Sequence, residues 1–303
     1  MRPTISVIIP TFNRAPELER LLKNLLSQTD PPDQVVVVDD HSTDLTKSVT
    51  EGLSCSSITY VKNDGRYQRD GKKTGIRHAK SEYLCFLDDD VIIEDVAFFA
   101  KIRPLLKKDT VIQAKAVMEN LGKTNIDKEA WSDFLAVRPY PVLEVVLPNY
   151  NTGQKNRRIY PLIEFGNFWH RDLASYFIDN NFTLDAFGES YASSLRLYLD
   201  NIPMVLVPSL VIRHPGATKG GSQRFNKKTI IRGLTEFHKG YFYNMIYIHS
   251  RYYPWFVWLW LPFYALKSGI GLLSSRDLKK WRQYSFNPMR EAVVKFLWRR
   301  DYA

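Results

Sequence analysis

The sequence predicts an α/β fold in which a doubly wound, mainly parallel sheet precedes a helical C-terminal appendage. Short runs rich in β-branched residues alternate with segments of helical periodicity, as in repeated β–α–β units with right-handed crossovers. The first run, residues 5–9, is apolar throughout, which is typical of a strand covered on both faces. Basic residues gather after residue 217, which indicates that the appendage is distinct from the sheet.

The predicted elements follow one another in chain order. After the strand at residues 5–9 we expect a helix at 17–26, because its leucines recur on one helical stripe. A second strand is expected at 35–38, followed by a helix at 43–52 that ends at its glycine. The later elements are expected in the order strand 58–61, helix 73–81, strand 83–87, helix 95–106 and strand 204–211.

Composition excludes several classes of protein. Of the 303 residues, 45% are hydrophobic and 24% are charged, so the chain has enough apolar material for a core and is not a disordered one. Its two cysteines are too few for a disulfide scaffold, and no Cys/His cluster has the spacing of zinc ligands. The N-terminus lacks the apolar stretch of a signal peptide, so we expect the chain to begin in a reducing compartment.

Charge is distributed unevenly along the chain. Residues 218–303 carry 16 Lys and Arg against 4 Asp and Glu, whereas residues 1–217 carry 26 against 28. We therefore predict a domain over 1–217, with halves at 1–117 and 118–217, and a basic, aromatic-rich helical region over 218–303. Such a tail fits either nucleic acid or an anionic membrane surface. Its basic residues are interleaved with an apolar block that nucleic acid would not cover, so we expect no nucleic-acid partner.

Polar clusters follow three of the predicted strands, at the edge where ligands of such sheets bind. They lie at residues 10–14, 39–44 and 88–90. Asp, Ser and Thr also serve as turn residues and helix caps, which stays an alternative for the first two clusters. Three consecutive carboxylates at 88–90 are poorly explained by capping, because like charges oppose one another's ionisation unless a cation neutralises them. Their oxygens suit Mg²⁺ or Mn²⁺, especially a cation shared with a substrate diphosphate.

These clusters and the strands before them resemble the opening of family 2 glycosyltransferases. The matching motifs are Ser6–Arg14, Val37–Asp44 and Phe86–Asp90, and their order and spacing agree over about 100 residues. The resemblance implies an inverting enzyme of the GT-A fold that uses a nucleotide-diphosphate sugar and a divalent metal. It implies that the base is received by Asp40 and that Asp88 and Asp90 form the DxD pair, with Asp90 the direct metal ligand. The implied nucleotide-sugar pocket consists of Pro10, Thr11, Arg14, Asp40, Lys72, Asp88 and Asp89.

Lys72 stands where many family members have an arginine, in the stretch Lys72–Ile76. A lysine still offers a point charge to phosphate but lacks the planar fork of arginine. A solvated run of charges over residues 66–80 is the alternative interpretation.

The general base is expected in the second half of the domain. Glu164–Arg171 resembles the wall that faces acceptor and donor sugar in the family, and Gly188–Leu197 resembles the helix that carries the base. At the position where the family commonly has the aspartate that acts as general base, this chain has Ser190. A serine cannot take a proton unaided at neutral pH. We predict that Glu189 is the base, because a helix N-terminus favours its ionised form; helix capping by Glu189, or Asp185 as base, are the alternatives.

His214 follows the last predicted strand, where the family often has a histidine that completes the metal shell. An imidazole beside carboxylates suits Mn²⁺ or Mg²⁺, although a histidine that ends a strand is otherwise usually structural. The metal ligands expected from the sequence are thus Asp88, Asp90 and His214.

The tail predicts attachment to a membrane. Residues 252–266 contain no charge but would span only about 22 Å as a helix, short of a hydrocarbon core of ~30 Å. Their Trp and Tyr residues prefer the membrane interface. We expect monotopic attachment to the cytoplasmic leaflet, which would bring the site to a lipid-linked or growing glycan acceptor. A full span through 252–273, and an aromatic helix packed on the catalytic domain, are the alternatives.

Two functions from other classes compete with the sugar transferase. A sugar-phosphate nucleotidyltransferase would need a glycine-rich basic loop after the first strand, and residues 10–14 are not one. A non-catalytic, membrane-bound sugar- or nucleotide-binding protein is supported by Ser190 alone.

Overall fold

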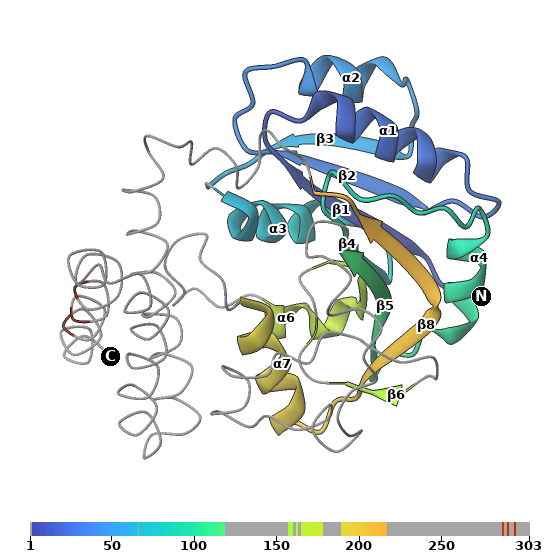
Figure 1. Cartoon of the computed structure of the whole chain (residues 1–303), viewed down its shortest axis with the longest axis vertical. Coiled ribbons are helices and arrows are strands. Elements are labelled where there is room, and N and C mark those ends of the chain that lie inside the picture. The colour runs from blue at the N-terminus through green and yellow to red at the C-terminus, as the bar shows by residue number, and fades with distance from the viewer. Residues whose placement is uncertain are drawn as a thin grey trace, which may run out of the picture. The chain divides into compact units, whose positions relative to one another are not determined.

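A computed structural model of the chain describes residues 2–65, 67–118, 157–159, 162, 165–177 and 189–216, with three further helical residues at 287, 290 and 294. The described strands form one eight-stranded sheet in the order β3-β2-β1-β4-β7-β5-β8-β6 (Figure 1). The strands are β1 (Ile5–Thr11), β2 (Gln34–Asp39), β3 (Ile58–Lys62), β4 (Tyr83–Phe86), β5 (Val111–Met118), β6 (Arg157–Arg158), β7 (Asn167–His170) and β8 (Met204–His214). The helices are α1 (Ala15–Leu26), α2 (Thr46–Gly52), α3 (Tyr67–His78), α4 (Phe98–Ile102), η1 (Arg103–Leu105), η4 (Arg171–Leu173), α6 (Ala174–Phe177) and α7 (Glu189–Leu199).

The predicted mainly parallel sheet is confirmed. Strands β1 to β4 pair in parallel, as do β5 and β8, whereas β7 pairs antiparallel with β4 and β5, and β6 pairs antiparallel with β8. The chain runs outward from β1 to β3 and then returns to place β4 on the other side of β1. Right-handed crossovers therefore put α1 and α2 on one face of the sheet and α3 on the other (Figure 1). The carboxyl ends of β1 and β4 meet at the point where the strand order reverses.

Alternate residues of β1 face the two helical layers. Ile5, Val7 and Ile9 belong to the core cluster that contains the leucines of α1, and each of them is fully buried. Ile8 and Pro10 point to the opposite face, where α3 lies against them. The apolar run of β1 is continuous because both of its faces are covered.

Helix α3 approaches the sheet more closely than a side chain would allow. A Cβ atom added at Gly75 would lie 2.2 Å from Cγ2 of Ile8, and one at Gly71 would lie 3.1 Å from Cβ of Pro10. The two glycines are one helical turn apart, so they form a flat strip along which α3 rests on β1.

Overpacking by Gly75→Ala should therefore cost about 1–3 kcal/mol, and the 2.2 Å approach to Ile8 favours the upper end of this range. The better helix propensity of alanine returns about 1 kcal/mol, which leaves a net destabilisation of about 2 kcal/mol. The matched control is Gly52→Ala at the end of α2, where an added Cβ meets no atom within 4 Å. Urea unfolding should give a lower midpoint for Gly75→Ala and an unchanged or higher one for Gly52→Ala. Equal midpoints for the two variants would show that α3 can move away from β1 freely.

Several element boundaries differ from those predicted. The helix expected at 73–81 is α3, which begins at Tyr67 and ends at His78; Lys72, Thr74 and Gly75 are buried in it, although the segment reads as charged. The helix expected at 43–52 begins at Thr46, whose N–H and Oγ1 both donate to Asp44.

Two further boundaries differ. The helix expected at 95–106 is divided into α4 and η1, with Pro104 inside η1. The last strand, expected to end at residue 211, continues to His214.

The predicted appendage, residues 218–303, lies outside the described residues except for the three helical positions named above. Among the residues that the structure does describe, no helix combines the length and the apolar character needed to cross a membrane. The domain boundary near residue 217 and the membrane attachment of the tail stay predictions.

Candidate active site

The loop after β1 and the loop after β4 are joined by buried hydrogen bonds. Thr11, the last residue of β1, donates from Oγ1 to Oδ2 of Asp89 at 2.8 Å. Nη1 of Arg14 donates to Oδ1 of Asp89 at 2.7 Å and to Oδ2 of Asp90 at 3.0 Å. All four residues are buried. The carboxylates after β4 are thus held in place from the neighbouring strand, at the edge of the sheet where ligands of this fold class bind.

A second pair of loops, after β1 and β2, is interlocked through Asn13. Its backbone lies in the left-handed region, with φ of 51°, and its N–H donates to Oγ of Ser42 at 2.9 Å. In return, Oδ1 of Asn13 accepts from the N–H of Thr43 at 2.7 Å. The polar residues that follow β2 are therefore positioned against those that follow β1.

The two aspartates at the end of β2 have different partners. Asp39 accepts from the hydroxyl of Tyr60 at 2.6 Å, and burial together with this hydrogen bond raises the pKa of the Tyr60 phenol. Asp40 is buried and accepts from Nδ2 of Asn63 at 2.8 Å, and its own N–H donates to the carbonyl of Thr11. Asp40 therefore lies beside Thr11 at the carboxyl ends of the strands, and its place in a nucleotide pocket stays a prediction.

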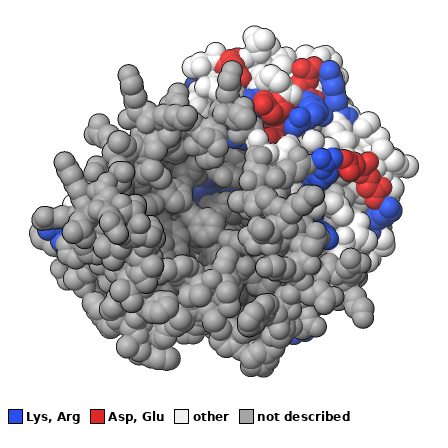
Figure 2. Space-filling model, in the orientation of Figure 1, with Lys and Arg blue, Asp and Glu red and all other residues white. Residues whose placement is uncertain are grey.

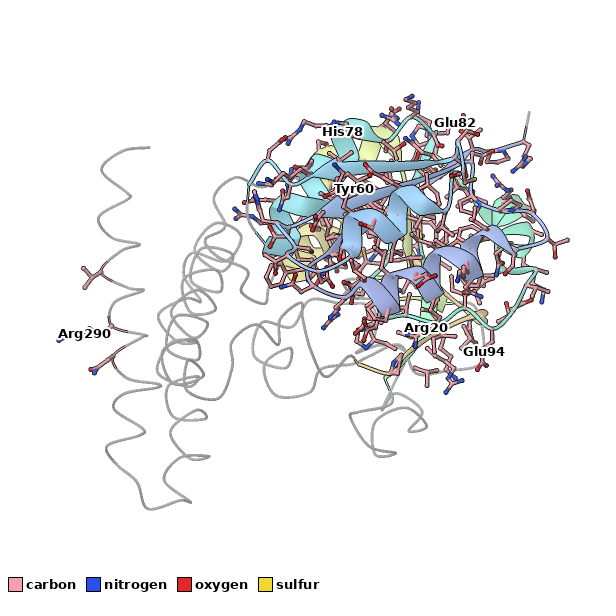
Figure 3. The ribbon with its side chains drawn as sticks, turned by 90° about the horizontal axis from the view of Figure 1, so that it is seen from above. Arg20, Tyr60, His78, Glu82, Glu94 and Arg290 are labelled. Carbon is pink, nitrogen blue, oxygen red and sulfur yellow. The ribbon has the colours of Figure 1, made fainter. Side chains whose placement is uncertain are left out.

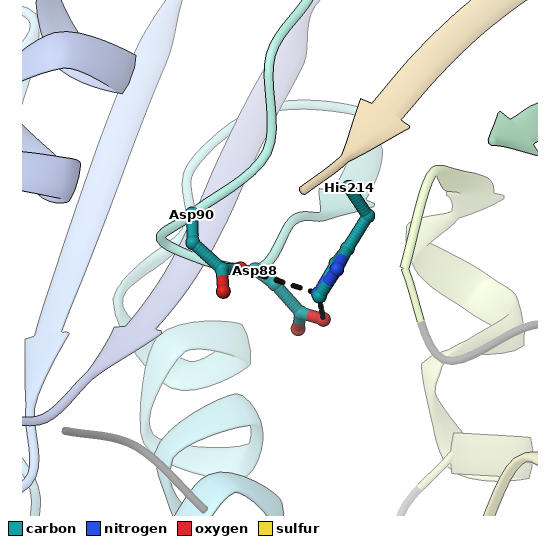
Figure 4. A group of neighbouring side chains, drawn as sticks. All are labelled: Asp88, Asp90 and His214. Atoms are coloured by element: carbon teal, nitrogen blue, oxygen red, sulfur yellow. Dashed lines mark ion pairs between the residues drawn. The ribbon is translucent and has the colours of Figure 1, made fainter. Parts of the chain in front are cut away.

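A two-residue bridge brings β8 to the carboxylates. The N–H of Ile92 donates to the carbonyl of Arg213 at 2.8 Å, and the N–H of Arg213 donates to the carbonyl of Ile92 at 2.9 Å. This bridge places His214, the next residue, beside the aspartates. Nε2 of His214 lies 3.4 Å from Oδ2 of Asp88 and 3.2 Å from Oδ1 of Asp90 (Figure 4).

The segment after Asp90 is also held by side chains from two directions. Nη2 of Arg20, on α1, donates to the carbonyl of Asp90 at 3.3 Å, and Arg213 forms an ion pair with Glu94. Figure 3 labels both Arg20, on α1, and Glu94, in the segment after Asp90. The segment from Asp90 to Glu94 is thus held at both of its ends.

Asp88 is surrounded by polar and cationic groups. Gln68, on α3, donates from Nε2 to Oδ1 of Asp88 at 2.7 Å. Burial by itself would raise the pKa of Asp88, but the hydrogen bond from His214 and the charges of Lys72 and Arg14 outweigh it, so the pKa is lowered. Asp88 is therefore an ionised carboxylate at neutral pH.

Lys72 is buried, with 1% of its surface exposed, and its ammonium lies 5.6 Å from the centroid of the Phe177 ring. The alternative of a solvated charge run over 66–80 is wrong for this residue. A buried ammonium keeps its charge only near compensating groups, and here Asp88 supplies one of them.

Asp89, the middle one of the three consecutive aspartates, differs from Asp88 in the direction of its pKa shift. Burial raises the pKa of Asp89 to about 6, against the opposing effect of Arg14. For Arg14, burial would lower the pKa, but the carboxylates of Asp89 and Asp90 raise it, so the guanidinium is firmly charged. For His214, the aspartates likewise outweigh burial and raise the pKa of the imidazole.

The geometry fits a divalent cation. Asp88, Asp90 and His214 each offer one ligand atom, and these atoms all lie within 4.8 Å of one another. Two carboxylates and one imidazole form a donor set that suits Mn²⁺ or Mg²⁺. Phe165 supports the imidazole, with ring centroids 5.0 Å apart.

The structure brings most of the predicted site residues to one edge of the sheet. The residues that contact or influence one another, as described above, are Thr11, Arg14, Lys72, Asp88, Asp89, Asp90 and His214. Pro10 is buried one residue before Thr11. Glu189 is the first residue of α7, but its side chain is outside the described part, as is all of Asp185. Ser190 is buried in the first turn of α7. The assignment of the base therefore stays a prediction.

Sequence reasoning missed Gln68 and Asn63, which hold Asp88 and Asp40. No spacing rule identifies them, because each reaches its aspartate across the fold.

On the described surface visible in Figure 2, acidic and basic side chains lie next to one another, so that part of the face carries no basic patch.

Comparison with known proteins identifies the family of the chain. Residues 6–165 match the family profile described as glycosyl transferase family 2. A β-1,3-glucosyltransferase from Campylobacter jejuni, named for GalNAc(5)-diNAcBac-PP-undecaprenol, is 39% identical over 92 residues, which cover 29% of this chain and 30% of that protein. The chain thus aligns with about a third of that relative's length.

Two solved structures share the fold. The mannosyltransferase PcManGT from Pyrobaculum calidifontis, solved with GDP-Man and Mn²⁺, has a TM-score of 0.54 at 18% identity over 98% of this chain and 88% of its own. TarS from Staphylococcus aureus, solved with UDP-GlcNAc, has a TM-score of 0.54 at 15% identity over 82% of this chain and 67% of its own. The GT-A fold expected from the sequence is confirmed. Because the family profile matches more than half of the chain, the protein belongs to glycosyltransferase family 2.

Proposed function

We propose that the protein is an inverting, metal-dependent hexosyltransferase that moves a sugar from a nucleotide-diphosphate sugar to a hydroxyl acceptor. The convergence of Asp88, Asp90 and His214 at the reversal point of the sheet carries this proposal. Solved neighbours of the same fold bind GDP-Man with Mn²⁺ and UDP-GlcNAc, which supports a donor of this class. Family membership favours transfer over the nucleotidyltransferase alternative.

In this proposal the cation is Mn²⁺ or Mg²⁺, held by Asp90, Asp88 and His214. When bound there, it would act as a Lewis acid that stabilises the charge developing on the leaving diphosphate. The positive charge of Lys72 also acts on Asp88. Asp40 would accept an N–H from the nucleotide base, and Pro10, Thr11, Arg14 and Asp89 would form the floor of the donor pocket.

The proposed reaction is a single displacement. The acceptor oxygen forms a bond to the anomeric carbon while the bond from that carbon to the diphosphate oxygen breaks, and the electron pair leaves with the nucleoside diphosphate. Attack from the face opposite the leaving group inverts the anomeric centre. Glu189 would take the proton of the acceptor hydroxyl, because its place at the start of α7 favours the ionised form.

A panel of nucleotide sugars tests the donor class. The full chain should release nucleoside diphosphate from at least one UDP-, GDP- or dTDP-sugar when Mn²⁺ or Mg²⁺ is present, and EDTA should stop this release. Release of sugar 1-phosphate with nucleoside triphosphate formation from added pyrophosphate would instead identify a nucleotidyltransferase. Donor binding without turnover under any condition would indicate the non-catalytic protein.

We further propose that the acceptor is lipid-linked or a growing glycan and that the tail holds the enzyme on the cytoplasmic face of a membrane. The Campylobacter jejuni relative is named for an undecaprenol-linked substrate, which supports an acceptor of this kind. The aromatic, uncharged run at 252–266 is bracketed by Arg251 and Lys267. Its composition supports an interfacial position.

The full chain should sediment with liposomes that contain anionic lipid at low salt and should stay in the supernatant with neutral ones. Each cation near the surface contributes about 1 kcal/mol, so the combined change Lys279→Glu, Lys280→Glu should lower the partition coefficient by more than tenfold. The matched control, Lys107→Glu with Lys108→Glu, changes two exposed lysines between η1 and β5 and should sediment as the parent does. Equal partition of the parent into both kinds of liposome, or into neither, would contradict electrostatic attachment.

A further inference from the structure

In both aspartates that would bind the cation, the two carboxylate oxygens have different partners. Oδ2 of Asp88 and Oδ1 of Asp90 lie against Nε2 of His214. The other oxygen of each carboxylate accepts a hydrogen bond from a side chain outside the candidate ligand set. For Asp88 the donor is Gln68, at 2.7 Å, and for Asp90 it is Arg14, at 3.0 Å.

A carboxylate that is held at one oxygen cannot turn freely about its Cβ–Cγ bond. Its second oxygen then keeps one direction, and outer partners of this kind are known to orient metal ligands and to raise the affinity for the metal. Because Arg14 also binds Asp89, it acts on two carboxylates at once. Gln68 is the residue through which the effect on one ligand can be tested.

We propose that Gln68 is a positioning residue of the cation site, which turns Asp88 so that Oδ2 faces His214 and the cation. This inference rests on the proposed metal-dependent function. As an amide, Gln68 donates a hydrogen bond without adding a positive charge, so it orients Asp88 and leaves the negative charge of the carboxylate available to the cation.

The rigidity of the donor comes from α3. Gln68 lies in the first turn of α3, and Lys72 follows one turn later on the same side of the helix, where its charge acts on Asp88. The helix is seated on β1 by the close contacts at Gly71 and Gly75. Gln68 therefore reaches Asp88 from an element whose distance to the sheet is fixed, rather than from a loop.

The test measures binding of Mn²⁺ to the full chain by electron paramagnetic resonance, once with Mn²⁺ alone and once with Mn²⁺ and saturating UDP or GDP. Gln68→Met keeps the length of the side chain and removes its N–H donor. We expect the dissociation constant for Mn²⁺ to rise about 10- to 100-fold, the range found for outer partners of metal ligands. The thermal unfolding midpoint in EDTA should stay close to that of the parent. If Gln68→Met folds poorly, Gln68→Ala removes the same donor without the bulk.

The matched control is Arg77→Met. Arg77 lies on the same helix and also donates to a carboxylate, that of Asp64, which is outside the candidate ligand set. Its variant should bind Mn²⁺ as the parent does.

The outcomes separate this inference from the function on which it rests. Parent-like Mn²⁺ affinity in both Gln68 variants would overturn the positioning role and leave the cation site standing. A loss of affinity matched by an equally large loss of stability in EDTA would also overturn it, because Gln68 would then act only on the fold. No Mn²⁺ binding by the parent in either arm, or undiminished binding by Asp90→Asn, would overturn the cation site itself.

Discussion

Asp90→Asn should lower the rate of sugar transfer by on the order of 10³-fold while the fold is retained. Asp90 is buried, with 1% of its surface exposed, and lies between the imidazole of His214 and the guanidinium of Arg14. Replacing its carboxylate by a neutral amide removes one of two negative ligands, and electrostatic stabilisation by a catalytic metal contributes several kcal/mol. Since each 1.36 kcal/mol changes a rate tenfold, a loss of about three orders of magnitude follows.

The measurement is donor turnover at saturating Mn²⁺, together with thermal unfolding in EDTA to show that the variant is folded. Asp109→Asn provides a matched control, because Asp109 is exposed and lies in the turn before β5, outside the candidate ligand set. It should transfer sugar at the parent rate. Full activity of Asp90→Asn, or undiminished activity of the parent in excess chelator, would remove Asp90 from the metal site.

Glu189→Gln should reduce kcat by about 10²-fold or more, with little change in donor affinity. Glutamine keeps the size of glutamate but cannot accept the proton of the acceptor hydroxyl. The effect should therefore fall on the chemical step, while the nucleotide, which is bound through other residues, is held as before. Donor affinity is measured by titration of the nucleotide sugar in the presence of Ca²⁺ or another non-supporting cation, and kcat by product formation.

Asp185→Asn is the comparison that decides between the two carboxylates. If Glu189 is the base, Asp185→Asn should keep most of the activity. If Asp185→Asn loses turnover and Glu189→Gln does not, the base is Asp185. A matched loss of helix stability in Glu189→Gln, without a change in kcat per folded molecule, would identify Glu189 as a helix cap only.

The strands of the N-terminal half were predictable because their signals are local. The run at residues 5–9 and the valines of β2 are apolar without interruption, since both faces of these strands are covered by helices. The three aspartates were predictable for a related reason. A buried strand that ends in three carboxylates is chemically unusual whatever the rest of the chain does.

The features that were not predictable depend on contacts between distant segments. Lys72 reads as one of many charges in the stretch 66–80, and its burial follows from the close seating of α3 on β1 at Gly71 and Gly75. The contact of Gln68 with Asp88 has the same origin. The extension of β8 to His214 depends on its pairing with β5, in which Met118 lies opposite His214, and the bridge between Ile92 and Arg213 adds a second contact; a single sequence contains no sign of either.

The bridge between Ile92 and Arg213 bears on the stage of folding at which the site forms. Asp88 and Asp90 follow β4, whereas His214 ends β8, the last strand in the described part of the chain, so a long segment must close to unite them. Closing a long loop costs entropy before its contacts repay it, and contacts of high sequence separation tend to form late. During synthesis, Asp88 and Asp90 are therefore made well before His214 can reach them. In the proposed function, the full set of cation ligands would then be assembled only when β8 has joined the sheet.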